Sequence, residues 1–82
     1  MSELKSIIDI KAYGKIKIKL SEMMDAKGVT RNKMRNLTGV KYDVVDRYYK
    51  AESIERIDLD FLAKACYVLN CTVGDLLEYE NE

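Results

Sequence analysis

Apolar and polar residues alternate strictly in one stretch near the start of the chain. In KIKIKL (residues 15–20) the isoleucines and the leucine fall on one side of an extended chain and the lysines on the other. A period of two predicts a half-buried strand. A strand needs a partner for its backbone edges, which could be residues 7–11, after a turn at Tyr13-Gly14, or residues 76–80. The first dozen residues also fit a helical turn, so their conformation stays open.

The remaining apolar residues recur three and four positions apart, which is typical of helices that bury one face. This spacing predicts five helices, at residues 20–27, 31–38, 41–50, 59–69 and 73–78. Residues suited to helix caps mark the ends: Thr30, Asp58 and the pair Thr72 and Asp75 at starts, Gly28 and Gly39 at ends. The side chains expected to be buried are Leu20, Met24, Met34, Leu37, Val40, Val45, Phe61, Leu62, Cys66, Leu69 and Leu76.

The pattern therefore predicts an all-α domain with a small N-terminal β element, possibly paired with the C-terminal segment. The chain has 82 residues, which is the size of one small domain with a thin core. It contains no proline and no repeat that would mark a linker. We divide the domain into an N-terminal arm and strand (1–19), a helical core (20–78) and an acidic tail (79–82).

Composition argues against several classes of protein. No apolar run approaches the roughly 18 residues of a membrane span, and the N-terminus is too charged for a signal peptide, so we expect a cytoplasmic protein. Cys66 and Cys71 stand five positions apart in a chain without histidine, a spacing that matches no common zinc or redox motif. Without histidine or a glycine-rich phosphate loop, we expect no enzyme, no metal site and no cofactor.

Charge is balanced over the whole chain but unevenly distributed along it. Residues 11–50 hold eleven Lys or Arg against four acids, and residues 51–82 hold two against eight. A surplus of seven positive charges in the middle of a neutral protein suggests one face for a polyanion and another held away from it.

The stretch TRNKMRNLTGVKYDVVDRYYK (residues 30–50) consists of a helix, a glycine and a second helix. Two short helices that cross sharply need a corner residue with positive φ, which Gly39 can adopt without steric cost. Inward residues such as Met34 and Val45 would fix the angle and leave the start of the second helix projecting. A projecting helix fits the major groove of B-DNA.

This unit, the short helix ending at Gly28 and the closing LDFLAKACYVLNCTVGDLLEY resemble the Cro/C1-type (Xre-like) helix-turn-helix regulators of bacteria and their phages. The resemblance covers about residues 18–77. It implies a five-helix, lambda-repressor-like fold. It also implies a sequence-specific transcriptional regulator, expected to be a repressor, that binds double-stranded DNA as a homodimer.

The resemblance assigns candidate DNA contacts to positions of this chain. Arg31 matches a position that contacts the phosphate backbone, where the helix N-terminus assists. The groove-facing positions are those at the start of the third helix and one turn beyond it: Lys41, Tyr42, Asp43, Val44 and Arg47. Lys33 and Lys50 complete the predicted DNA-binding set. The chain departs from the family pattern at Arg35, where alanine is usual, and at Lys41, where Ser or Thr commonly caps the helix.

Two aspartates lie on the helix that should meet a polyanion, and Asp43 has two interpretations. Asp43 and Asp46 stand four residues before Arg47 and Lys50, an order that stabilises a helix by side-chain pairing. Alternatively, Asp43 accepts a hydrogen bond from a cytosine amino group or orients Arg47 toward a guanine.

A second hypothesis from another class is a helix-turn-helix protein-interaction module, adaptor or antitoxin-like, that does not read DNA. Zero net charge and the acidic C-terminus EYENE keep this alternative open. For the homodimer, we expect the lysine-rich strand to pair within the chain, because lysine-rich edges discourage sheet extension. In that case Leu77 and Tyr79 would carry the dimer contact.

Overall fold

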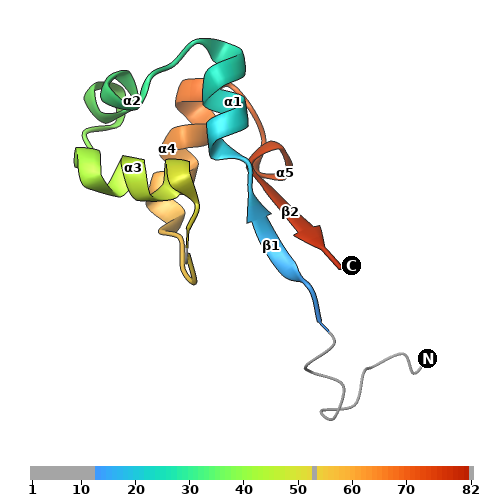
Figure 1. Ribbon diagram of the computed structural model, residues 1–82. Helices are drawn as coiled ribbons and strands as arrows, with labels where there is room; N and C mark the ends of the chain where they lie inside the picture. Colours follow the sequence, from blue (N-terminus) through green and yellow to red (C-terminus); the bar gives the residue numbers. More distant parts are fainter. Residues whose placement is uncertain (1–12, 53, 82) are drawn as a thin grey trace.

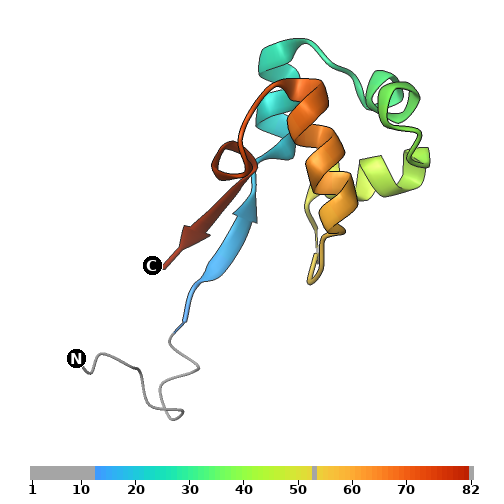
Figure 2. The ribbon, with the colours of Figure 1, turned by 180° about the vertical axis from the view of Figure 1, so that it is seen from behind.

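The computed structural model describes residues 13–52 and 54–81, which form five helices and two strands. In chain order these are β1 (Lys15–Ile18), α1 (Leu20–Lys27), α2 (Arg31–Thr38), α3 (Tyr42–Lys50), α4 (Leu59–Leu69), α5 (Val73–Leu76) and β2 (Leu77–Glu80). The helices gather into one body, and the two strands form a ribbon that projects from it, away from α2 (Figures 1 and 2). The five helices and the small sheet agree with the predicted helical domain, whose β element pairs with the C-terminal segment, but the label all-α is not confirmed.

Local hydrogen bonds start and end the helices where the sequence predicts. The side chains of Thr30 and Asp58 accept from the backbone N–H groups three residues later, at 3.1 and 2.9 Å. Thr72 and Asp75 form the predicted capping box. Gly28 and Gly39 adopt the left-handed conformation at the ends of α1 and α2. These caps satisfy backbone groups that have no partner inside a helix.

Two helix boundaries differ by one and two residues from the approximate positions that the sequence predicts. Helix α3 begins at Tyr42 rather than residue 41, because Lys41 is the N-cap residue and has extended backbone angles. Helix α5 ends at Leu76 rather than residue 78, because Leu77 is already extended and starts β2. Residues 77–80 therefore form one strand, although the prediction placed the first two in the last helix and the other two in the acidic tail.

The ribbon pairs β1 with β2 in antiparallel register, with Ile16 opposite Tyr79 and Ile18 opposite Leu77. The C-terminal segment is thus the partner of the lysine-rich strand, and pairing within the chain is confirmed. The other candidate, residues 7–11, lies outside the described residues. Ile18 is half-buried but Ile16 is 58% exposed, so only the base of the ribbon meets the predicted half-buried pattern.

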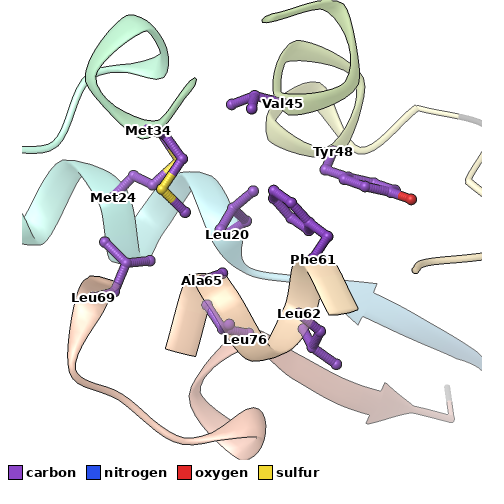
Figure 3. Packing of buried hydrophobic residues seen from close by; sticks show 10 residues of the cluster. All are labelled: Leu20, Met24, Met34, Val45, Tyr48, Phe61, Leu62, Ala65, Leu69 and Leu76. Atoms are coloured by element: carbon purple, nitrogen blue, oxygen red, sulfur yellow. The ribbon is translucent and has the colours of Figure 1, made fainter. Parts of the chain in front are cut away.

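The core joins one face of every helix. Its ten buried residues are Leu20, Met24, Met34, Val45, Tyr48, Phe61, Leu62, Ala65, Leu69 and Leu76 (Figure 3). Tyr48 of α3 stacks near Phe61 of α4 with ring centroids 4.8 Å apart, and its hydroxyl accepts from the backbone N–H of Asp58 at 3.2 Å. This contact fixes α3 against α4 and orients the opposite face of α3 outward.

Three residues of the predicted core differ from expectation. Val40 and Cys66 are half-buried against the core, and Leu37 is 53% exposed. The buried position that we assigned to Leu37 is taken by Thr38, one residue later, which shares a helix face with Met34. A polar residue can fill it because its hydroxyl donates to the carbonyl of Met34 at 2.7 Å. Cys66 and Cys71 are both free.

Candidate nucleic-acid interface

The corner between α2 and α3 is fixed by two devices. Gly39 adopts φ 75°, a conformation that costs other residues strain. The buried Thr38 hydroxyl donates to Met34 O inside α2 and accepts from the backbone N–H of Val40 at 3.2 Å. The corner is therefore hydrogen-bonded to the end of α2 and holds α3 at a defined angle.

Helix α3 has a buried face and an outward face. Val45 and Tyr48 are buried, and Val44 is half-buried and packs against the core. Tyr42, Asp43 and Arg47 are exposed on the outward side, as are Lys50 at the end of the helix and Lys41 just before it. The predicted DNA-binding residues of α3 therefore gather on one surface, apart from Val44, whose side chain is turned partly inward.

Arg31, the first residue of α2, is held by side chains of α3. Its Nη1 donates to Asp46 Oδ1 at 2.5 Å, and its guanidinium carbon lies 4.6 Å from the centroid of the Tyr49 ring. The arginine side chain remains 36% exposed. A guanidinium has five N–H donors in a planar fork, so the bond to Asp46 leaves donors for a further partner.

The network extends from Arg31 to α1. Tyr49 donates its hydroxyl proton to Asp25 Oδ1 at 3.0 Å, and this bond raises the pKa of the Tyr49 hydroxyl. Asp46 also accepts from Lys50, at 3.1 Å. The Lys50 bond is the main reason that the pKa of Asp46 is lowered; partial burial opposes it, and the bond from Arg31 adds to it.

The two aspartates of α3 thus have different environments. Asp46 is paired with two cations, Arg31 and Lys50. Asp43 is exposed, and within the described part of the chain no ion pair joins it to Arg47. The Arg47 guanidinium instead lies 5.2 Å from the centroid of the Tyr48 ring. Asp46 has a structural role in bringing α2 and α3 together, whereas Asp43 and Arg47 remain available to a ligand.

Charge is segregated between this unit and the rest of the domain. Residues 30–50 carry six Lys or Arg against two acids, whereas residues 58–80 carry one against five. The lysines of the ribbon are matched by carboxylates: Lys19 pairs with Glu78 at 3.5 Å, and Lys17 with Glu22 at 3.7 Å. Helix α2 carries three positive charges and no acid, whereas the two acids of α3 balance Arg47 and Lys50. Positive charge in excess of local acids therefore lies on α2 and Lys41, not on α3 or the ribbon.

Comparison with known families agrees with this arrangement. The family model of the Cro/C1-type helix-turn-helix DNA-binding domain matches residues 19–82. The chain belongs to this family. Comparison with curated proteins gives no match. Membership supports DNA as the partner of this Cro/C1-type domain and does not favour the protein-interaction alternative.

Two further observations bear on the Cro/C1-type domain. None of its described helices is long and apolar enough to cross a membrane. In residues 13–52 and 54–81, no group of acidic or cysteine side chains is arranged to hold a metal ion.

Sequence reasoning missed two members of the network around Arg31. These are Asp25 and Tyr49, to which the sequence assigns no contact with this part of the chain. Asp25 lies 24 positions from Tyr49, and Asp46 lies 15 from Arg31, so no local spacing reveals either contact. Only the packing of α1, α2 and α3 brings these side chains together.

Proposed function

We propose that this domain is a sequence-specific reader of double-stranded DNA that inserts α3 into the major groove and acts as a transcriptional repressor. The observation that carries the proposal is the outward surface of α3, on which Tyr42, Asp43 and Arg47 are exposed. Hydrogen bonds and apolar contacts at base edges are what distinguish one sequence from another.

Arg31 and Arg47 have different proposed roles. Arg47 projects from the middle of α3, where a guanidinium can bond the O6 and N7 atoms of guanine. Arg31 lies at the N-terminus of α2, where backbone N–H groups also favour a phosphate. Lys33, Lys41 and Lys50 supply additional positive charge around this surface, and Val44 contributes its exposed part. Asp43 would reduce non-specific attraction to phosphates while leaving a cytosine contact open.

Repression follows from occupancy alone, because a protein bound over a promoter blocks other proteins from the same DNA. One recognition helix reads only a few base pairs, which is too little for discrimination within a genome. We therefore also propose a homodimer that binds two half-sites about one helical turn apart. A cytoplasmic location belongs to the same proposal.

The test begins with selection of a preferred duplex from a random library, followed by affinity measurements on that duplex and on unrelated DNA. Arg47→Ala should weaken binding to the selected duplex by about 1–3 kcal/mol and relax preference at one base pair. Arg56→Ala, a matched control at an exposed arginine after α3, should leave that preference intact.

Arg31→Ala should instead weaken binding to all duplexes about equally. It should also reduce the dependence of affinity on salt by about one phosphate contact. The proposed function is refuted if neither Arg47→Ala nor Arg31→Ala changes duplex binding at low salt.

A further inference from the structure

The projecting ribbon has one apolar face and one charged face. Cross-strand pairs place Ile16 beside Tyr79 and Ile18 beside Leu77 on the same side. The opposite side carries Lys15 beside Glu80 and Lys17 beside Glu78. Ile18 and Leu77 pack against the core at the base of the ribbon. Ile16 and Tyr79, further out, are 58% and 55% exposed.

This apolar face needs a cover for two physical reasons. A two-stranded ribbon is marginally stable in water unless further strands or a packed layer support it. An isoleucine and a tyrosine directly opposite each other also form one contiguous apolar patch rather than scattered exposed residues. Ile16 also lines an open groove between β1 and the chain after α3, where apolar residues such as Ile54 stand beside charged residues such as Lys17 and Glu55.

We infer that a second copy of this chain covers the apolar face of the ribbon, so that two ribbons pack face to face around Ile16 and Tyr79. The inference deepens the proposed function, since it names the surface that would join the two DNA-reading units. The same pair of residues in both copies gives an interface that closes on itself under a two-fold axis.

The charges of the ribbon disfavour closed arrangements in which the strand edges of two copies pair. Pairing the free edge of β1 with that of another β1 sets Lys15 and Lys17 among a second set of lysines. Pairing two β2 edges does the same with Glu78 and Glu80. Pairing β1 with β2 of another copy would match opposite charges, but it is head to tail and leads to an open chain of molecules. Face-to-face packing keeps all four charged residues on the outer sides.

The size of the patch sets the strength of the dimer. Covering one isoleucine and one tyrosine per protomer removes on the order of 500 Å² from water, well below the roughly 1,200 Å² of a standard interface. The dimer is therefore weak in free solution and is completed when two copies occupy adjacent half-sites, because DNA raises their local concentration.

Self-association is measured first without DNA, by sedimentation and light scattering from micromolar to near-millimolar concentration. The full chain should show a reversible monomer–dimer equilibrium. Ile16→Thr keeps the β-branched shape but removes apolar area twice per dimer, so the dissociation constant should rise about tenfold or more. Tyr79→Gln should act in the same direction.

Tyr67→Gln is the matched control, because Tyr67 on α4 is 88% exposed but lies outside the ribbon. It should change the dissociation constant by less than about twofold. An isotope-filtered NMR spectrum of mixed labelled and unlabelled protein should show contacts between Ile16 of one copy and Tyr79 of the other. Circular dichroism checks that each variant remains folded.

The inference is overturned if the full chain stays monomeric throughout this range, or if Tyr67→Gln weakens self-association as much as Ile16→Thr. It is also overturned if Ile16→Thr leaves the equilibrium unchanged. Because these measurements contain no DNA, a ribbon dimer that binds no duplex would refute the proposed function and leave this inference standing. A monomer that binds DNA in a sequence-specific way would overturn this inference and leave the proposed DNA-reading role standing.

Discussion

Replacing Thr38 with valine should destabilise the domain more than replacing its larger apolar neighbour Leu37 with alanine. Thr38 is buried, with 9% of its surface exposed, whereas Leu37 is 53% exposed. Valine keeps the branched shape of threonine but cannot accept from the backbone N–H of Val40. Residue type alone would suggest the opposite, that truncating the leucine costs more stability than replacing the threonine.

The magnitude follows from the two hydrogen bonds of the Thr38 hydroxyl. The carbonyl of Met34 lies inside α2, where the helical hydrogen-bond pattern supplies a backbone donor. Most of the lost stability therefore comes from the N–H of Val40, which is left without an acceptor. An unsatisfied, partly buried N–H costs about 1–3 kcal/mol, and the added methyl group of valine offsets part of that cost. We expect a net loss of about 1–2 kcal/mol, or roughly 5–15 °C in Tm for a domain of this size.

Thermal and urea unfolding measure the stability, and amide hydrogen exchange measures the N–H of Val40 directly. Thr38→Val should lower Tm and speed exchange of the Val40 amide beyond the change in global stability. Leu37→Ala should cost less than about 1 kcal/mol, against about 2–5 kcal/mol for a leucine in a packed core. A larger loss for Leu37→Ala, or an equally protected Val40 amide in Thr38→Val, would refute this account of the corner.

Three other substitutions test separate features. Asp46→Asn should weaken binding to all duplexes about equally, although it removes a negative charge, because it releases Arg31, the proposed phosphate contact. Asp43→Asn should instead strengthen binding to all duplexes. Titrations in which both variants gain affinity equally would show that Asp46 does not position Arg31. The pKa of Asp75 is lowered, chiefly by backbone and side-chain hydrogen bonds with Thr72. The contribution of ionised Asp75 to the folding stability is therefore complete above the ordinary Asp pKa of about 4, and it is lost as pH falls through the lower pKa of the folded state. Asp75→Asn should therefore show a smaller drop in Tm on acidification than the unsubstituted chain, and an equal drop would contradict the assignment. Gly14→Ala should disorder the outer ribbon and leave the helical body folded, because an added Cβ would meet the backbone of Glu80; unchanged NMR signals in β1 and β2 would contradict this.

Features set by local chemistry were predictable from the sequence. The caps at Thr30, Asp58 and Thr72, and the left-handed glycines at 28 and 39, each depend on atoms within a few residues. The five helices therefore lie close to their predicted positions. The alternation in residues 15–20 predicted the strand β1 but left its partner open between residues 7–11 and 76–80, and the structure pairs it with the C-terminal segment.

Features that depend on packing between elements were not predictable in the same way. The period of LLEYE fits a continuing helix as well as a strand, and only pairing with β1 makes it extended. The choice between Leu37 and Thr38 depends on where α4 and α3 lie relative to α2. For the site, the sequence predicted which helix presents the candidate contacts. The bonds of Asp46 and Tyr49 to residues of other helices follow only from the fold.

The most direct test of the central claim, that α3 meets duplex DNA, is an NMR titration of the full chain with a DNA duplex of mixed sequence at low salt. The largest backbone amide shifts should map to the start of α2 around Arg31 and to the outward surface of α3 around Tyr42, Asp43 and Arg47. The outer face of α4, around Tyr67, should stay unchanged. Shifts that map to α4 instead, or no shifts at any DNA concentration, would contradict the claim that α3 is a DNA-reading helix.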